Sequence, residues 1–219
     1  MKKLFNAIRN SDINEVKEII TKKPELVNCV AKQPPKKDDG QSPLQVAFKT
    51  GNTDIAEYLI DMGANVNFIE DESCCNSWRT PVLHDAINCA VMLSRWNTND
   101  DLRGFKVYST KERADEGLRL LKKMIATGAD VNAVDSHGNS GLNRFVLQAN
   151  QILPSYNYVE HKEGKNRLFT DELHTDLRNI LQELKDAGAD VNYKAPNIGY
   201  SIREFCREGS ISILIDEVF

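Results

Sequence analysis

Long hydrophobic runs are missing from this sequence. No stretch of about 18 apolar residues occurs, which is the length a membrane-spanning helix needs. The start, MKKLFNAIRN, has the lysines of a signal peptide, but polar residues interrupt the apolar segment that such a peptide requires. Cysteines are few, odd in number and spaced like neither a disulfide framework nor a zinc site: Cys29, Cys74, Cys75, Cys89 and Cys206. We therefore expect no membrane partner and a reducing, cytoplasmic setting.

An excess of positive charge is also missing. The formal net charge is -4, whereas proteins that bind nucleic acid usually carry a basic surface, so no nucleic acid is expected as a partner. The sequence contains no phosphate-binding glycine-rich loop and no nucleophile elbow. His161 and His174 lie near several acidic residues, but their spacing matches no known set of metal ligands. We predict no catalytic residue, no cofactor and no metal.

One short pattern occurs three times. GANVN spans residues 63–67, and GADVN spans 128–132 and again 188–192. A glycine in this place ends a helix with positive φ, and the following alanine is small enough for a crowded contact. The valine points inward, and the Asp or Asn side chains can bond the turn backbone. The recurrence predicts that three units of the chain make the same turn against the same kind of neighbour.

The residues before the first pentapeptide predict two short antiparallel helices. Ser42 is placed to cap the first helix, with Pro43 at its first position, and Gly51 can end it. The segment S-P-L-Q-V-A, the glycine and the closing pentapeptide together resemble an ankyrin repeat, whose pattern is T-P-L-H-x-A in a unit of about 33 residues. The resemblance implies an all-α ankyrin-repeat solenoid of antiparallel helix pairs with β-turn fingers.

The same template fits nearly the whole chain as a single domain, 1–219, in which the last unit ends without a finger. Pro81 to Gly128 and Gly141 to Gly188 each span 47 positions, whereas Pro43 to Gly63 spans 20. Each of these two repeats therefore carries 27 extra residues (47 − 20). Neither gap shows the marks of a hidden repeat, so we expect longer helices joined by loops that lie side by side. The fingers at 29–41 and 68–79 are also long. The predicted repeats are 2–28, 39–67, 80–132, 135–192 and 197–219, with inserts at about 94–110 and 154–170.

Several residues are candidates for structure or for binding. His84 holds the histidine position of the family pattern, and Gln45 and Asn143 hold it in other repeats; the resemblance implies that this side chain ties a helix to a finger. Trp and Arg are common anchors of protein interfaces, which favours Trp78 and Arg79. The predicted partner-binding residues are Lys49 and Thr50, at the family's variable positions, and Trp78, Arg79, Ser136 and His137 on the fingers.

The resemblance implies a non-enzymatic module that binds a partner protein through its concave face and fingers. Two alternatives stay open from the sequence. One is a dedicated inhibitor, such as an immunity, phage or viral factor that blocks one target protein. The other is a small-molecule binder or an enzyme that uses a pocket between the two inserts. It would be favoured if His161, His174 and nearby carboxylates were clustered and buried.

Overall fold

The structure is a computed structural model that describes residues 1–33 and 35–219. Pro34, which belongs to the long finger predicted at 29–41, lies outside the described residues. Ten α-helices, two 3₁₀ turns and two hairpins make up the described part. The α-helices are α1 (Lys2–Arg9), α2 (Ile13–Lys22), α3 (Pro43–Lys49), α4 (Thr53–Asp61), α5 (Val82–Leu93), α6 (Lys111–Ala126), α7 (Gly141–Ala149), α8 (Asp171–Asp186), α9 (Ile202–Phe205) and α10 (Ser210–Val218). The other elements are η1 (Pro24–Asn28), η2 (Lys36–Asp38), β1 (Asn97–Asp100), β2 (Gly104–Val107), β3 (Tyr156–Asn157) and β4 (Lys162–Glu163).

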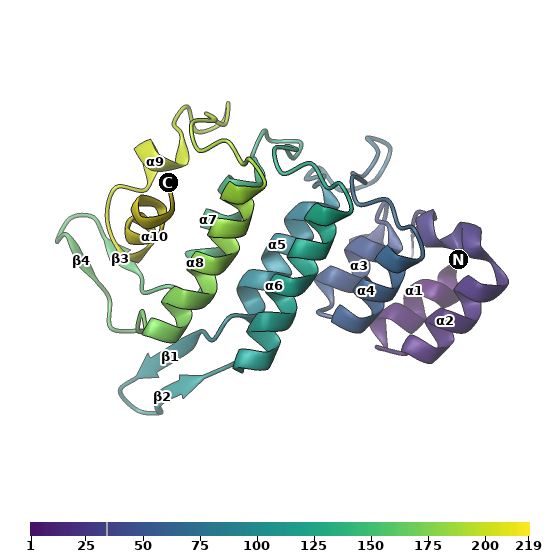
Figure 1. Ribbon diagram of the computed structural model, residues 1–219, viewed down its shortest axis with the longest axis horizontal. Coiled ribbons are helices and arrows are strands. Elements are labelled where there is room, and N and C mark those ends of the chain that lie inside the picture. The colour runs from purple at the N-terminus through teal and green to yellow at the C-terminus, as the bar shows by residue number, and fades with distance from the viewer. Residues whose placement is uncertain (34) are drawn as a thin grey trace.

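The helices form antiparallel pairs arranged in two rows (Figure 1). We call α1, α3, α5, α7 and α9 the inner helices, because each begins directly after a finger or at the chain start. The outer helices are α2, α4, α6, α8 and α10. From α1 to α8, each inner helix packs on its outer partner and on the next inner helix, while the outer helices pack on one another. Every pair therefore covers the apolar side of its neighbour, as stacked repeats require.

Local sequence signals set where the helices begin. Ser42 accepts the Gln45 N–H at the start of α3, and the Gln45 side chain accepts the Ser42 N–H in return, which is a capping box. Ser140 and Ser201 cap α7 and α9 in the same way. Ser109 has capping-box spacing to Glu112 in the sequence, which predicts a helix cap, but it does not cap the next helix. It donates to the Leu93 carbonyl, and Thr110 is the cap of α6.

The repeated pentapeptide closes each outer helix and joins it to the next repeat. Gly63, Gly128 and Gly188 have φ values of +85°, +99° and +89°, as predicted for the turn that ends these helices. The third residue of each pentapeptide accepts the N–H of the fifth within the same turn, also as predicted.

The last asparagine of the pentapeptide has a further role that the sequence-based interpretation missed. The Asn67 side chain donates to the Gly128 carbonyl at 2.8 Å and accepts the Asp130 N–H at 2.8 Å. Asn132 makes the same pair of bonds to Gly188 and Asp190. Each pentapeptide is thus hydrogen-bonded to the next one along the row of repeats.

The expectation of an all-α fold needs correction at both inserts. Where loops were predicted, β1 pairs with β2 and β3 pairs with β4, each as an antiparallel two-stranded sheet. The inserts do touch, as predicted. Asn97 exchanges two hydrogen bonds of 2.8 Å with the backbone of Leu168, and Asn99 N–H donates to the Asn166 carbonyl at 2.8 Å. The first hairpin is therefore hydrogen-bonded to the second insert. Both inserts lie at the end of the helix pairs that is opposite the fingers (Figure 1).

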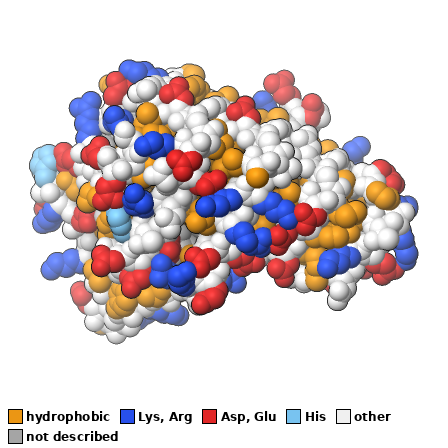
Figure 2. All heavy atoms as spheres, in the orientation of Figure 1, with side chains coloured by type: hydrophobic (Ala, Val, Ile, Leu, Met, Phe, Trp, Pro, Cys, Tyr) orange, Lys and Arg blue, Asp and Glu red, His pale blue; other side chains and the backbone are white. Residues whose placement is uncertain are grey.

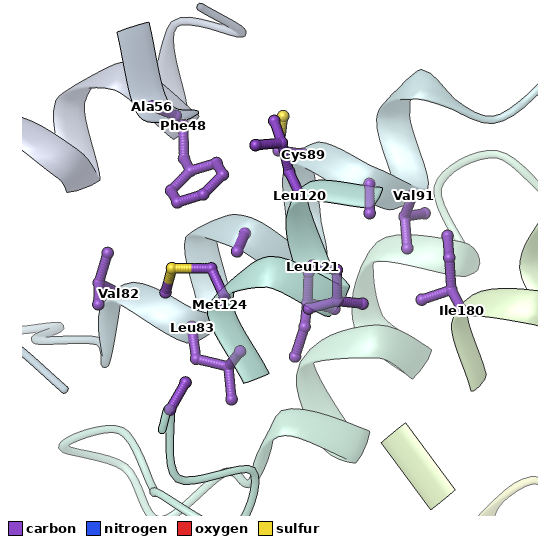
Figure 3. Packing of buried hydrophobic residues seen from close by; sticks show 14 of the residues in the cluster. Phe48, Ala56, Val82, Leu83, Cys89, Val91, Leu120, Leu121, Met124 and Ile180 are labelled. Carbon is purple, nitrogen blue, oxygen red and sulfur yellow. The ribbon is translucent and has the colours of Figure 1, made fainter. Parts of the chain in front are cut away.

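One hydrophobic core runs along the rows of helices. Its members come from inner and outer helices alike, and the long outer helix α6 contributes three of those labelled in Figure 3. Across the residues that the structure describes, no helix is long and apolar enough to cross a membrane. The labelled core residues are Phe48, Ala56, Val82, Leu83, Cys89, Val91, Leu120, Leu121, Met124 and Ile180.

Candidate functional site

Four of the six predicted binding residues lie together where two fingers meet. The Trp78 indole N–H donates to Asp135 Oδ2 at 2.7 Å, while 45% of the residue stays exposed. His137 packs edge-to-face on the same ring, with 5.3 Å between ring centroids. Ser136 and Arg79 are joined by two bonds, from Ser136 N–H to the Arg79 carbonyl and from Arg79 N–H to Ser136 Oγ. Trp78 is thus anchored at one edge on the neighbouring finger and leaves part of its ring exposed to solvent.

Asp135 organises this finger junction, although the sequence analysis did not select it. Its Oδ1 accepts the N–H groups of His137 and Asn139, and its Oδ2 accepts from the Trp78 indole. Burial alone would raise the pKa of the Asp135 carboxyl, but hydrogen bonds from Asn139, Trp78 and His137 together lower it. The Arg144 guanidinium lies 3.4 Å from Asp135 Oδ2 and 4.8 Å from the centre of the Trp78 ring. The ring is therefore held by a stacked cation as well as by a hydrogen bond.

The other two predicted residues, Lys49 and Thr50, line a separate pocket at the C-terminal end of α3. Lys49 Nζ lies 3.7 Å from Glu70 Oε1 and 3.8 Å from Asp85 Oδ2. The Thr50 hydroxyl donates to the Val46 carbonyl at 2.7 Å, so it closes its own helix. The structure therefore brings Lys49 and Thr50 to one place on the inner helices, but not into the finger junction.

The pocket contains a buried acid that sequence reasoning also missed. Asp85, on α5, is 4% exposed. Burial raises the pKa of its carboxyl to about 7, although Lys49 opposes the shift. Glu70 is buried beside it and accepts the Thr80 N–H at 2.7 Å. Nothing in the local sequence predicts these carboxyl groups to be neighbours, because they come from a finger and a helix of different repeats.

Two other titratable groups near these residues are held in neutral form by burial. His84 lies in the core and its Nε2 is 3.1 Å from the Ala133 carbonyl, which confirms the predicted link between a helix and a finger. Burial lowers the pKa of His84 to about 4. Burial raises the pKa of the Cys89 thiol to about 12, so the thiolate that a nucleophile needs is scarce at neutral pH.

The outer helices present a different surface. On the face shown in Figure 2, acidic and basic side chains alternate over these helices. Several of them pair across neighbouring repeats: Arg119 Nη2 lies 2.8 Å from Glu57 Oε2, and Lys123 Nζ lies 2.6 Å from Asp61 Oδ1. These charges are already engaged with one another.

The two insert histidines contact different partners. His161 lies 2.9 Å from Glu208 and is largely exposed, whereas His174 lies 2.7 Å from Glu217 near the C-terminus. The described residues hold no group of three or more His, Cys, Asp or Glu side chains that could bind a metal ion. His161 and His174 therefore do not form one buried cluster with carboxyl groups, which is the arrangement that would favour the enzyme alternative.

Comparison with protein families gives a match in the first part of the chain. Residues 4–95 match the family model described as ankyrin repeats, in three copies. Over these residues the chain is similar to ankyrin repeats, as the resemblance of the S-P-L-Q-V-A segment indicated. Comparison with the curated proteins gives no match. Ankyrin repeats generally mediate interactions between proteins.

Proposed function

We propose that this protein is a non-enzymatic ankyrin solenoid that holds a partner protein against its inner helices and fingers. The observation that carries the proposal is Trp78, an exposed aromatic ring fixed in place by Asp135, His137 and Arg144. A side chain that is already ordered loses little conformational entropy on binding, so it is well suited to anchor a partner. We place the protein in the cytoplasm, a proposal that rests on the odd number and the spacing of its cysteines.

The inner and outer helices have different surfaces, and this difference supports the inner helices and fingers as the binding face. The outer helices engage their charges in pairs between repeats, such as Arg119 with Glu57. The inner helices and fingers carry the exposed ring of Trp78 and the pocket beside Lys49. A partner on this face would meet an aromatic anchor and a concave site, which are the features of an interface centre.

The experiment is a quantitative capture of partners from a lysate of the source organism. Three baits are compared: the wild type, the Trp78→Ala/Arg79→Ala double variant and Tyr158→Ala. Tyr158 is the matched control, because it is an exposed aromatic residue on the second insert rather than on a finger. We expect one partner to be captured by the wild type and by Tyr158→Ala, and its recovery to fall at least tenfold with the double variant.

Circular dichroism melting of each bait shows that the variants remain folded. Equal recovery of the same partner by the wild type and the double variant would show that the finger junction is not the binding face. Loss of the partner with Tyr158→Ala alone would move the binding face to the inserts.

A further inference from the structure

A pocket of about 390 Å³ opens between the C-terminal end of α3 and the side of α5 that runs from Asp85 to Leu93. Lys49 and Phe48 line it from α3, and Asp85, Asn88 and Met92 line it from α5. It therefore lies between the inner helices of two successive repeats, on the face to which the proposed function assigns the partner.

Two buried oxygen atoms of this pocket accept no hydrogen bond from any described residue. They are Asp85 Oδ2 and Asn88 Oδ1. Lys49 Nζ is 3.8 Å from the Asp85 oxygen, which is beyond hydrogen-bonding distance. Buried acceptors without donors are costly and rare, so a ligand that supplies donors here gains more than it would at a solvated surface.

The charges around the pocket favour a cation. Two carboxyl groups, from Asp85 and Glu70, face one ammonium group, from Lys49. Arg144 also acts on Asp85 through its charge, but its guanidinium is engaged by Asp135 and the Trp78 ring. Gln45, the remaining polar group that acts on Asp85, is neutral. Because burial raises the pKa of the Asp85 carboxyl to about 7, this group loses its proton near neutral pH; with both carboxyl groups ionised, the pocket then carries one more negative than positive charge.

Part of the lining is apolar. Phe48, Met92 and Leu93 form walls beside the two acceptors. A ligand that suits both features has a hydrocarbon stem and ends in a group with several N–H donors and a positive charge. Lysine and arginine side chains have this construction, because their methylene stems pack on apolar surfaces while their heads donate hydrogen bonds.

We propose that the pocket between α3 and α5 binds a lysine or arginine side chain of the partner protein, with Asp85 Oδ2 and Asn88 Oδ1 as acceptors. The inference rests on the proposed function, since it names the chemistry of the partner residue that enters the inner face. Lys49 turns toward Glu70 when the pocket is occupied, and the incoming cation takes its place beside Asp85.

The test is a titration of the full chain carrying ¹³C-methyl methionine, followed by NMR. The probes are Nα-acetyl-lysine methylamide, its arginine counterpart and Nα-acetyl-norleucine methylamide, which has a lysine-like stem without the charge. Met92 lines the pocket, and the exposed Met62 after α4 is the internal control. We expect the Met92 methyl signal to shift saturably with the two cations, with a dissociation constant on the order of millimolar for so small a ligand. The norleucine probe binds at least tenfold more weakly, and Met62 does not shift.

Asp85→Asn keeps the shape of the side chain and is expected to weaken cation binding about tenfold, while Tyr158→Ala, on the second insert, leaves it unchanged. The inference is overturned if norleucine or a glutamate analogue binds as tightly as lysine, or if Asp85→Asn has no effect. If no cation shifts Met92 while partner capture still depends on Trp78, the pocket assignment is wrong and the proposed function stands. If the cations bind but no partner is captured, the cation preference of the pocket stands, while its assignment to a side chain of a partner protein is overturned together with the proposed function.

Discussion

The carboxyl group of Asp85 lies buried beside one ammonium group and one other carboxyl group, those of Lys49 and Glu70. Burial raises its pKa from 3.8 to about 7, with Lys49 and Arg144 opposing the shift and Glu70 adding to it. A buried acid whose pKa is raised in the folded state binds more protons there than in the unfolded chain. Stability therefore falls as pH rises from about 4 to about 7.

Replacing Asp85 by asparagine removes the ionisable group, so the variant does not lose this stability as pH rises. We expect Asp85→Asn and the wild type to have similar free energies of unfolding at pH 4, and the variant to be more stable at pH 8 by roughly 1 to 3 kcal/mol. Urea unfolding at the two pH values measures the difference. A variant that is no more stable than the wild type at pH 8 would show that ionisation of the buried carboxyl group does not lower the free energy of unfolding.

Single residues differ in how far the sequence predicts their roles. His84 was placed correctly because its position in the repeat pattern fixes both its burial and its finger partner. The roles of Asp85 and Asp135 were missed. Glu70 and Arg144 reach Asp85 from other repeats, and Trp78 reaches Asp135 from the preceding finger; no short pattern records which side chains meet across a stack.

At the scale of elements, the pentapeptides form a hydrogen-bonded series with a natural control at its end. The Asn132 side chain bonds the backbone of Gly188 and Asp190, whereas the Asn192 side chain makes no such bond to any residue that the structure describes. We expect Asn132→Ala to lower the free energy of unfolding by about 1 to 2 kcal/mol, from two hydrogen bonds, and Asn192→Ala to change it by less than about 0.5 kcal/mol. Equal effects of the two substitutions in thermal or urea unfolding would contradict a role between repeats.

The first hairpin offers a second matched pair. Asn97 is fully buried and its side chain makes two bonds of 2.8 Å with Leu168, whereas Asn99 is half-buried and its side chain makes one bond of 3.1 Å with Lys165. Asn97→Ala leaves the Leu168 backbone groups without partners, and we expect it to cost about 1 to 3 kcal/mol. Asn99→Ala should cost less than about 1 kcal/mol, because water replaces its bond. Urea unfolding of both variants measures the two costs, and a larger cost at Asn99 would contradict this account of the inserts.

The hairpins themselves could not be predicted from local pattern. The strand β1, Asn97–Asp100, is wholly polar, so it lacks the alternation that indicates a half-buried strand. It is stabilised by β2 on one side and by residues 165–168 on the other. The helix starts at Ser42 and Thr170 were predictable, because a capping residue acts within one turn of its own helix.

At the scale of the whole molecule, the ankyrin match ends at residue 95, but the helix pair that begins with α5 does not. The outer partner of α5 is α6, which lies beyond the first hairpin and packs along α5. Leu121 and Met124 of α6 are fully buried against this part of the core (Figure 3). A fragment of residues 1–95 would therefore expose the face of α5 that α6 covers, whereas a fragment of residues 1–132 completes the pair.

We expect the 1–132 fragment to unfold cooperatively, because stacked repeats draw their stability from nearest-neighbour contacts. Its stability should be lower than that of the full chain, since α7 and α8 no longer pack on α5. The 1–95 fragment should melt without a cooperative transition or aggregate, because its uncovered α5 exposes apolar surface. Circular dichroism melting and sedimentation of the two fragments test this. If the shorter fragment were monomeric and melted as cooperatively as the longer one, the repeat would end at the family match, and the inserts would be additions to a complete domain. If only the longer fragment folds, the hairpin lies inside a repeat, because the helices on either side of it form one folding unit.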